Sequence, residues 1–337
     1  MSIRAVIFGC DGLELSAEEQ TFFREVQPWG FILFKRNCDS PDQVRKLTGQ
    51  MRALLGRPNA PILIDQEGGR VQRLRGDHWR SRPAPASFGA LNRQDPATAR
   101  EMAYTNARLM AKDMLDIGVN VDCTPVIDVP VDGAHDIIGD RAFGRDPWLV
   151  ASLGQAVIDG MLDGGVLPVI KHIPGHGRAR ADSHMELPVV DTPRDELERT
   201  DFAPFRALAQ SPFAMTAHVV YSAIDPNNPA TTSKRVIDEI VRGFMGYDGC
   251  LLTDDLTMRA MKGTLTERVK ASLAAGCDII LHCMRNMDEM REIAAATPVL
   301  SGKALDRAER ALRALKPAKP FAVAEAQTRL DAALGVA

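Results

Sequence analysis

Short apolar segments recur along this chain and alternate with segments of helical periodicity, and this alternation limits the possible folds more than any other feature. Most of the segments follow or begin with a glycine, and several are apolar throughout rather than at alternate positions, as in parallel strands buried on both faces. One helical segment covers residues 40–55, where Ser40 suits the N-cap and Pro41 the first helical position. The predicted strands are residues 5–8, 30–34, 61–64, 118–122, 165–170, 212–216, 249–253 and 276–281.

Eight strand–helix units predict an α/β fold of the (β/α)8 barrel type, and the connection lengths support it. Turns that enter strands are short, whereas the segments that leave them are long and polar, as at residues 65–90, 124–146, 171–192 and 217–232. Barrel enzymes keep their active sites at the face where these long segments lie. The rival fold is a doubly wound open sheet, but no GxGxxG follows the first strand. We expect one catalytic domain over residues 1–337, with a tail from about residue 316 that packs on the barrel or frays.

Composition narrows the class of partner. The net charge is −3 and the Lys and Arg residues are scattered, which disfavours a nucleic-acid partner and favours a small molecule. No run reaches the roughly 18 apolar residues of a membrane span, so neither a membrane partner nor a leader is expected and the protein is predicted to be cytoplasmic. The six cysteines show no CxxC spacing, which indicates reduced thiols rather than a zinc-thiolate site. We expect a monomer that needs no cofactor.

Polar residues follow the predicted strands, and those at two strand ends are candidates for catalysis. Asp254 and Asp255 leave the seventh strand, and because they are adjacent only one can face the barrel mouth. A carboxylate near Arg73, Arg141 and Lys171 would stay ionised and could act as a nucleophile. The alternative is that both aspartates cap a following helix.

Residues 171–184 form a polar loop that begins with Lys171 and His172 and ends with Asp182-Ser-His184. In an extended segment Asp182 and His184 share a side, so the carboxylate could orient the imidazole for proton transfer. Unrelated surface residues would give the same spacing. A zinc site using His172, His176, His184 and Asp182 is a further alternative, although Pro174 and Gly175 keep the first two from sharing a helix face. Lys171 could also form a Schiff base, as in an aldolase, or donate hydrogen bonds to a sugar.

Several segments, taken in order, resemble the bacterial β-N-acetylglucosaminidases of glycoside hydrolase family 3. The similarity covers nearly the whole chain and is carried by Asp65-Gln-Glu-Gly-Gly-Arg-Val-Gln-Arg73, Asp140-Arg-Ala-Phe-Gly144, Lys171-His-Ile-Pro-Gly-His-Gly177 with Asp182-Ser-His184, Thr216-Ala-His-Val219 and Thr253-Asp-Asp-Leu-Thr-Met258. The resemblance is to the compact single-domain form that serves peptidoglycan recycling. It implies release of non-reducing N-acetylglucosamine from disaccharides that end in 1,6-anhydro-N-acetylmuramic acid, with or without the stem peptide.

The resemblance also implies roles for individual residues. Asp254 takes the place of the nucleophile, His184 that of the acid/base and Asp182 that of its orienting partner. The sugar-binding positions fall on Asp65, Arg73, Arg141, Lys171 and His172. No metal ligand or cofactor is implied. The implied reaction retains configuration through a glycosyl-enzyme intermediate, with the His–Asp pair in place of the usual second carboxylate.

Some residues keep open roles. Arg70, Arg178, Arg180 and His135 have no assigned function, although Arg178 and Arg180 could meet a muramyl carboxylate or stem peptide. Ile173 stands where an aromatic residue is common in the family, which should alter packing rather than chemistry. A non-catalytic muropeptide sensor is the remaining alternative, and it predicts binding without release of sugar.

Overall fold

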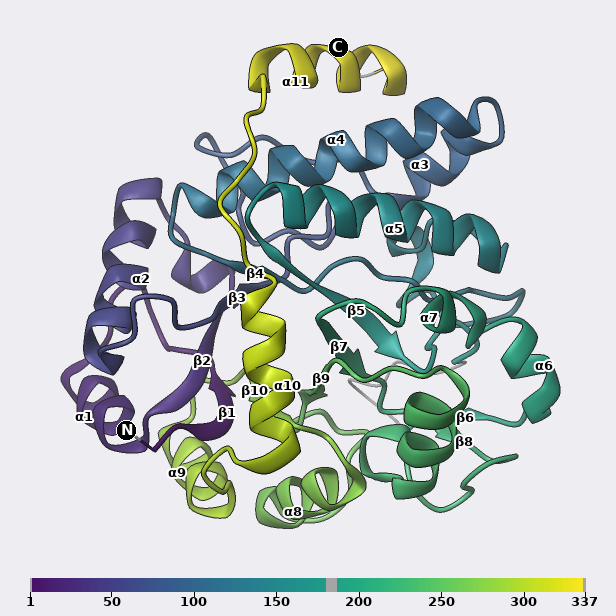
Figure 1. The fold of residues 1–337 in the computed structure, drawn as a ribbon. Coiled ribbons are helices and arrows are strands. Elements are labelled where there is room, and N and C mark those ends of the chain that lie inside the picture. The colour runs from purple at the N-terminus through teal and green to yellow at the C-terminus, as the bar shows by residue number, and fades with distance from the viewer. Residues whose placement is uncertain (1, 180–186, 336–337) are drawn as a thin grey trace.

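The computed structural model describes residues 2–179 and 187–335, and all eight predicted strands close into one parallel barrel (Figure 1). Neighbouring strands pair in parallel from the first to the last, which itself pairs with the first. The predicted (β/α)8 fold is therefore confirmed. In barrel order the strands are β1 (Arg4–Phe8), β2 (Pro28–Leu33), β3 (Ile62–Ile64), β4 (Val121–Asp122), β5 (Leu167–Ile173), β7 (Phe213–Thr216), β9 (Cys250–Asp255) and β10 (Ile279–His282).

Helices surround the barrel, and a small parallel sheet of β6 (Val189–Val190) and β8 (Val220–Tyr221) lies beside it. A helix that follows Ser233 begins with α-helical residues 234–235, and the Ser233 carbonyl accepts the Ile237 N–H at 3.0 Å. It continues as a π-helix, η4 (Val236–Phe244). Three short 3₁₀ segments are η1 (Lys35–Asn37), η2 (Gly139–Arg141) and η3 (Ala230–Thr232). The α-helices that accompany the strands are α1 (Ala17–Val26), α2 (Pro41–Leu55), α3 (Pro85–Asn92), α4 (Pro96–Leu115), α5 (Pro147–Asp163), α6 (Arg194–Arg199), α7 (Ala203–Ala207), α8 (Leu265–Ala275) and α9 (Met287–Ala296).

Helix α2 shows how local sequence sets an element. The Ser40 hydroxyl accepts a hydrogen bond from the Gln43 N–H, Pro41 occupies the first turn, and Gly56 ends the helix in the left-handed conformation. The buried residues recur on one side of the helix, at Val44, Leu47, Thr48, Met51 and Leu55. The N-cap and apolar face predicted for this segment are confirmed.

The barrel strands send alternate side chains to two separate cores. Along β1, Ile7 belongs to the cluster that fills the barrel, whereas Val6 and Phe8 belong to the cluster between strands and helices. This alternation follows from the two-residue period of a strand. It decides which residue at each strand end faces the barrel mouth.

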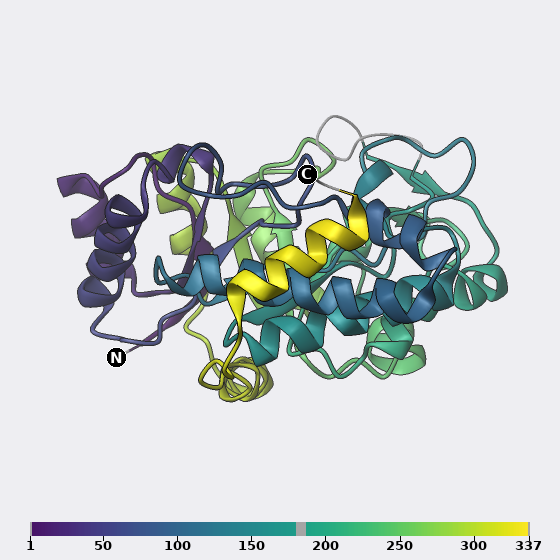
Figure 2. The same cartoon turned by 90° about the horizontal axis from the view of Figure 1, so that it is seen from above.

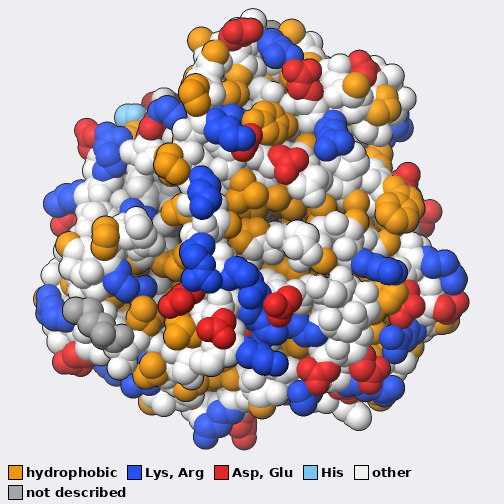
Figure 3. Space-filling model, in the orientation of Figure 1, with side chains coloured by type: hydrophobic (Ala, Val, Ile, Leu, Met, Phe, Trp, Pro, Cys, Tyr) orange, Lys and Arg blue, Asp and Glu red, His pale blue; other side chains and the backbone are white. Residues whose placement is uncertain are grey.

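Two helices follow the last strand and lie on different sides of the barrel. Helix α10 (Gly302–Arg313) crosses the end at which the strands begin, and α11 (Val323–Leu334) lies along α4 (Figures 1 and 2). The tail therefore packs on the barrel helices through Ala326 and Leu330. On the face that α10 crosses, positive and negative side chains are intermixed with apolar ones (Figure 3).

All six cysteines are unpaired, and four of them are buried, as the spacing indicated. Within the described ranges, no helix is both long and apolar enough to traverse a bilayer.

Candidate active site

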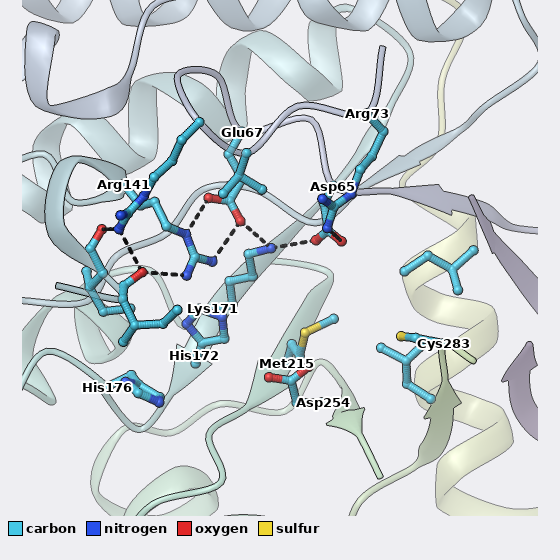
Figure 4. A pocket seen from close by; sticks show the side chains of 16 residues that line it. Asp65, Glu67, Arg73, Arg141, Lys171, His172, His176, Met215, Asp254 and Cys283 are labelled. Carbon is cyan, nitrogen blue, oxygen red and sulfur yellow. Dashed lines mark hydrogen bonds and ion pairs between the residues drawn. The ribbon is translucent and has the colours of Figure 1, made fainter. Parts of the chain in front are cut away.

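A pocket of about 390 Å³ opens where the barrel strands end (Figure 4). This is the face at which the long polar segments were predicted to gather. All five predicted sugar-binding residues and Asp254 line it, so residues from β3, β5, β9 and the segment after β4 meet in one place. Its further lining residues are Ile32, Glu67, Arg70, Val71, Ile137, Ile138, His176, Met215, Leu281 and Cys283.

The strand period explains why three of these charged side chains point into the mouth. Leu63 and Val169 fill the barrel, so Asp65 and Lys171, two residues further on, face the same way. On β9, Cys250 and Leu252 lie in the barrel interior. Asp254 continues that series, which Asp255 cannot.

Five charged side chains form one ion-pair cluster on the β3–β5 side of the pocket (Figure 4). Lys171 Nζ lies 2.7 Å from Asp65 Oδ1 and 2.6 Å from Glu67 Oε1. Arg141 binds both oxygens of Glu67, at 2.8 and 2.9 Å, and Arg73 binds Asp65 at 2.9 Å. Three cations thus surround two carboxylates, which leaves one positive charge in excess.

The cluster keeps all of its members charged. Burial alone would raise the pKa of Glu67, but Lys171 and Arg141 outweigh it and lower this pKa to about 2. Lys171 and Arg73 likewise hold the pKa of Asp65 well below its usual range against burial. Burial would lower the pKa of Lys171, but Asp65 and Glu67 raise it above its ordinary value. An ammonium held in this way is a hydrogen-bond donor and is poorly suited to Schiff-base chemistry, which needs a neutral amine.

Asp128 organises the segment that follows Lys171. Its Oδ2 accepts from His172 Nδ1 at 2.7 Å, and its Oδ1 accepts the N–H groups of His172 and His176 at 3.2 and 2.7 Å. Burial raises the pKa of Asp128, but His172 and the other donors lower it overall. Since the Nδ1–H group of His172 donates its hydrogen bond to this carboxylate, Nε2 is the ring nitrogen left for the pocket.

The other side of the pocket holds Asp254. Its Oδ1 accepts the Asp255 N–H at 2.8 Å, whereas the Asp255 carboxylate turns to Thr257, whose hydroxyl donates to it at 2.7 Å. The two aspartates therefore diverge, as predicted from their adjacency, and only Asp255 stabilises the following turn. The three cations expected around Asp254 line the same pocket but pair with Asp65 and Glu67 instead.

His218 lies next to Asp254 and supports its backbone. The Asp255 carbonyl can only accept, so His218 Nε2 donates to it at 3.0 Å, and Nδ1 meets the Thr231 hydroxyl at 2.7 Å. Burial lowers the pKa of His218, so the ring is neutral near pH 7. Burial also raises the pKa of Asp254, but His218, His172, the Asp255 N–H and Lys171 lower it overall.

The remaining predicted residues are placed as follows. Asp182, His184 and Arg180 lie outside the described residues. Arg178 binds Asp201 Oδ2 at 2.6 Å and Glu196 at 2.9 Å, and so anchors its own segment. Arg70 pairs with Asp140 at 3.0 Å and with Asp136 at 3.3 Å, and so holds the segment that carries Arg141. His135 is exposed, as expected.

Sequence reasoning missed Glu67 and the part that Asp128 plays. Glu67 lies two residues after Asp65, and the strand period was a usable signal for a second inward carboxylate. Asp128 lies more than 40 residues from the histidine it orients, and nothing in the spacing indicated that pairing. Across residues 2–179 and 187–335, no group of His, Cys, Asp or Glu is arranged to hold a metal ion, and two of the four ligands of the zinc alternative lie outside those ranges.

Comparisons with known proteins agree with the motifs. The family model described as Glycosyl hydrolase family 3 N terminal domain matches residues 5–314. A β-hexosaminidase of Alkalilimnicola ehrlichii is 44% identical over 287 residues, which are 84% of this chain and 81% of that protein. A β-hexosaminidase of Bordetella avium is 38% identical over 313 residues, 91% of this chain and 86% of that one. The crystal structure of NagZ from Neisseria gonorrhoeae in complex with N-trifluoroacetyl-D-glucosamine superposes with a TM-score of 0.88 at 32% identity, covering 100% of this chain and 98% of that chain.

Proposed function

Because the chain belongs to glycosyl hydrolase family 3 and is a β-N-acetylhexosaminidase, we propose that it releases N-acetylglucosamine from GlcNAc-1,6-anhydroMurNAc, with or without the stem peptide, with retention of configuration. The observation that carries the mechanism is Asp254, an ionised carboxylate at the end of β9 that faces the ion-pair cluster across one pocket. We place the enzyme in peptidoglycan recycling, as a cytoplasmic monomer. The complex of the Neisseria protein with an N-acylated glucosamine supports an amino sugar as the ligand.

The ion-pair cluster suits the glycone sugar. Sugar hydroxyls are neutral donors and acceptors, and hydrogen bonds to ionised groups are roughly twice as strong as those between neutral groups. Lys171 has three N–H donors, and Asp65 and Glu67 use two of them. In this proposal Asp65, Arg73, Arg141, Lys171 and His172 bind the sugar and place its anomeric carbon beside Asp254.

The cluster also argues for a proton donor from another part of the chain. Asp65 and Glu67 have lowered pKa values, so neither can protonate a leaving group near pH 7. Burial lowers the pKa of His176 to about 4, which makes it a poor acid as well. We assign the acid/base role to His184, oriented by Asp182. In the first step Asp254 attacks the anomeric carbon while His184 protonates the departing oxygen, and in the second His184 takes a proton from the attacking water.

The described pocket contains a rival His–Asp pair, His172 with Asp128 at 2.7 Å. The two assignments differ in their dependence on the leaving group. If His184 is the acid, His184→Ala should lower kcat/KM, which reports the first step, only slightly for an aryl substrate with an activated leaving group and far more for the natural disaccharide, whereas His172→Gln should lower both alike. The opposite pattern would transfer the role to His172.

The decisive measurement follows sugar release and its stereochemistry. Proton NMR of the first product formed should show β-configured N-acetylglucosamine, and an α product would exclude the glycosyl-enzyme route. In His184→Ala with an activated aryl substrate, added azide should restore turnover and give the β-glycosyl azide, because azide needs no general base. Asp255→Asn serves as the matched control for Asp254→Asn, because the Asp255 carboxylate accepts from Thr257 and from the Cys283 N–H and does not itself line the pocket. Release of sugar from the anhydromuramyl disaccharide, compared with chitobiose, tests the substrate.

A further inference from the structure

The segment that joins β3 to α3, residues 65–84, carries Asp65, Glu67 and Arg73, yet it has little regular structure. We call it the β3–α3 loop. Its first half folds on itself, because Gln66 Oε1 accepts the N–H groups of Arg73 and Leu74 at 2.9 and 3.1 Å. The Glu67 N–H donates to the Val71 carbonyl at 2.9 Å. The position of Glu67 is therefore tied to that of the loop tip.

The backbone of Arg82 closes this loop. Its N–H donates to Gln72 Oε1 at 2.9 Å, and its carbonyl accepts the Gly69 N–H at 2.9 Å. The two ends of the loop approach so closely that a Cβ at Gly68 would lie 2.1 Å from the Pro83 carbonyl oxygen. A shift of the Arg82 backbone would therefore also move residues 68–72.

The side chain of Arg82 leaves the loop and joins two helices. Its guanidinium is nearly buried, pairs with Asp113 of α4, and donates to Gln327 Oε1 of α11 at 2.8 Å. A second contact joins the loop to α11, between Arg80 and Asp331 at 2.8 Å. Gln327 Nε2 also donates to Asp331 at 2.9 Å, which links the two anchor points within the helix.

We propose that Arg82 is a positioning residue for sugar binding and that helix α11 is the brace through which it acts. The connection begins at Gln327, which accepts from the Arg82 guanidinium. The Arg82 backbone in turn binds Gly69 and Gln72. Residues 68–72 then set the position of Glu67, which holds Lys171 and Arg141. The helix lies along α4 (Figures 1 and 2), and none of its residues is among those that line the pocket. The proposal rests on the sugar-binding roles proposed above.

Helix α11 offers a matched control for this idea. Arg329 of the same helix pairs with Glu101 of α4, an exposed contact that does not involve the loop. Loss of that pair loosens α11 on α4 without releasing Arg82. Variants at Gln327 and Arg329 therefore separate bracing of the loop from attachment of the helix.

The experiment compares Gln327→Met, Arg80→Gln and Arg329→Met in the full-length protein, with an aryl β-N-acetylglucosaminide as substrate. We expect Gln327→Met to raise KM about fivefold with kcat changed less than about twofold, as for a residue that modulates a site without touching ligand. Amide hydrogen exchange of residues 66–75 should quicken in the same variant. Arg80→Gln should shift both quantities in the same direction, and Arg329→Met should leave both unchanged.

Unchanged KM and exchange in both Gln327→Met and Arg80→Gln would overturn the proposal, as would equal changes in Arg329→Met. Arg82→Met removes all side-chain contacts at once and should give a larger rise in KM; the conclusion does not depend on it if that variant fails to fold. Arg141→Ala separates this proposal from the one on which it rests. A normal KM in Arg141→Ala contradicts the sugar-binding assignment, whereas exchange of residues 66–75 reports on the brace alone.

Discussion

At the ends of β3 and β5, five charged side chains bind one another, whereas at the ends of β7 and β9 Asp254 lies beside a histidine that burial keeps neutral. Both regions are buried, and both hold carboxylates. On the first side each carboxylate is paired with cations, and on the second Asp254 accepts a backbone N–H and has no ion pair among the described residues.

This difference indicates a division of work in the pocket. A carboxylate that is paired with two cations is fixed in place and is a weak nucleophile, because its charge is already neutralised. An ionised carboxylate held by a single N–H keeps its charge available for attack on carbon. The paired side can then hold the sugar while the unpaired side reacts with it.

The largest effect should come from the unpaired side. Asp254→Asn removes the proposed nucleophile with little change in size, and we expect kcat/KM for an aryl β-N-acetylglucosaminide to fall by a factor on the order of 10⁴, a part of the total enhancement typical of enzymes. Asp255→Asn should keep far more activity. If the two variants fell equally, or Asp255→Asn fell further, the assignment of the nucleophile would be wrong.

On the paired side, Glu67→Gln should weaken both binding and folding. The variant leaves Lys171 and Arg141 buried with one carboxylate fewer, and loss of one partner of a buried ion pair costs about 3 kcal/mol of unfolding free energy. We expect KM to rise more than kcat falls, because the proposed role is to hold the sugar-binding cations. Urea unfolding and steady-state kinetics measure the two effects, and Lys234→Ala, which removes an exposed pair with Asp238, should change stability by less than about 0.5 kcal/mol.

The same cluster should make stability depend on acid pH. The pKa of Glu67 is about 2 in the folded protein against an ordinary value of 4.5, so the unfolded chain binds the proton first. The stability that this carboxylate contributes is complete above about pH 4.5 and is lost as the pH falls toward 2. Between pH 5 and pH 3, the unfolding free energy of wild type should therefore drop more than that of Glu67→Gln. Equal slopes for the two proteins would show that Glu67 is not the titrating group.

Substitution of His218, the neutral residue that supports the backbone beside Asp254, should have a smaller effect on activity. The His218 ring bridges the Thr231 hydroxyl and the Asp255 carbonyl, and His218→Gln should lose this bridge. Asp254 would then be misplaced, and misplacement of a reacting group lowers the rate without weakening binding. We expect kcat to fall about tenfold, with KM within about twofold of wild type. Thr231→Val should also lower kcat, whereas Thr231→Ser, which keeps the hydroxyl, should have a kcat close to that of wild type. A change in KM alone would place His218 with the sugar-binding residues.

Much of this molecule could be predicted from local patterns. Each of the eight strands was visible as a short apolar run because both of its faces are buried, and the long polar segments marked the face that carries the pocket. The signals at Ser40 and Pro41 placed the start of one helix correctly. The family motifs indicated the family, and the comparisons confirm it. The roles of individual site residues remain proposals.

Other features could not be read from the order of residues. The pairing of Glu67 with Arg141 spans 74 positions, and that of Arg82 with Gln327 spans 245. Residues 236–244 are helical, but they are wound as a π-helix rather than an α-helix. Local propensity contains no information on any of these, because each depends on which elements the closed barrel brings together.

The sequence by itself determined the strands, the barrel, the polar face and the adjacency that sends Asp254 and Asp255 apart, because backbone period and burial act over a few residues. Only the tertiary structure decided that Asp65 and Glu67 would be ion-paired while Asp254 would not. Ionisation and reactivity depend on distances between side chains from β3, β5, β7 and β9. Those distances are set when the sheet closes.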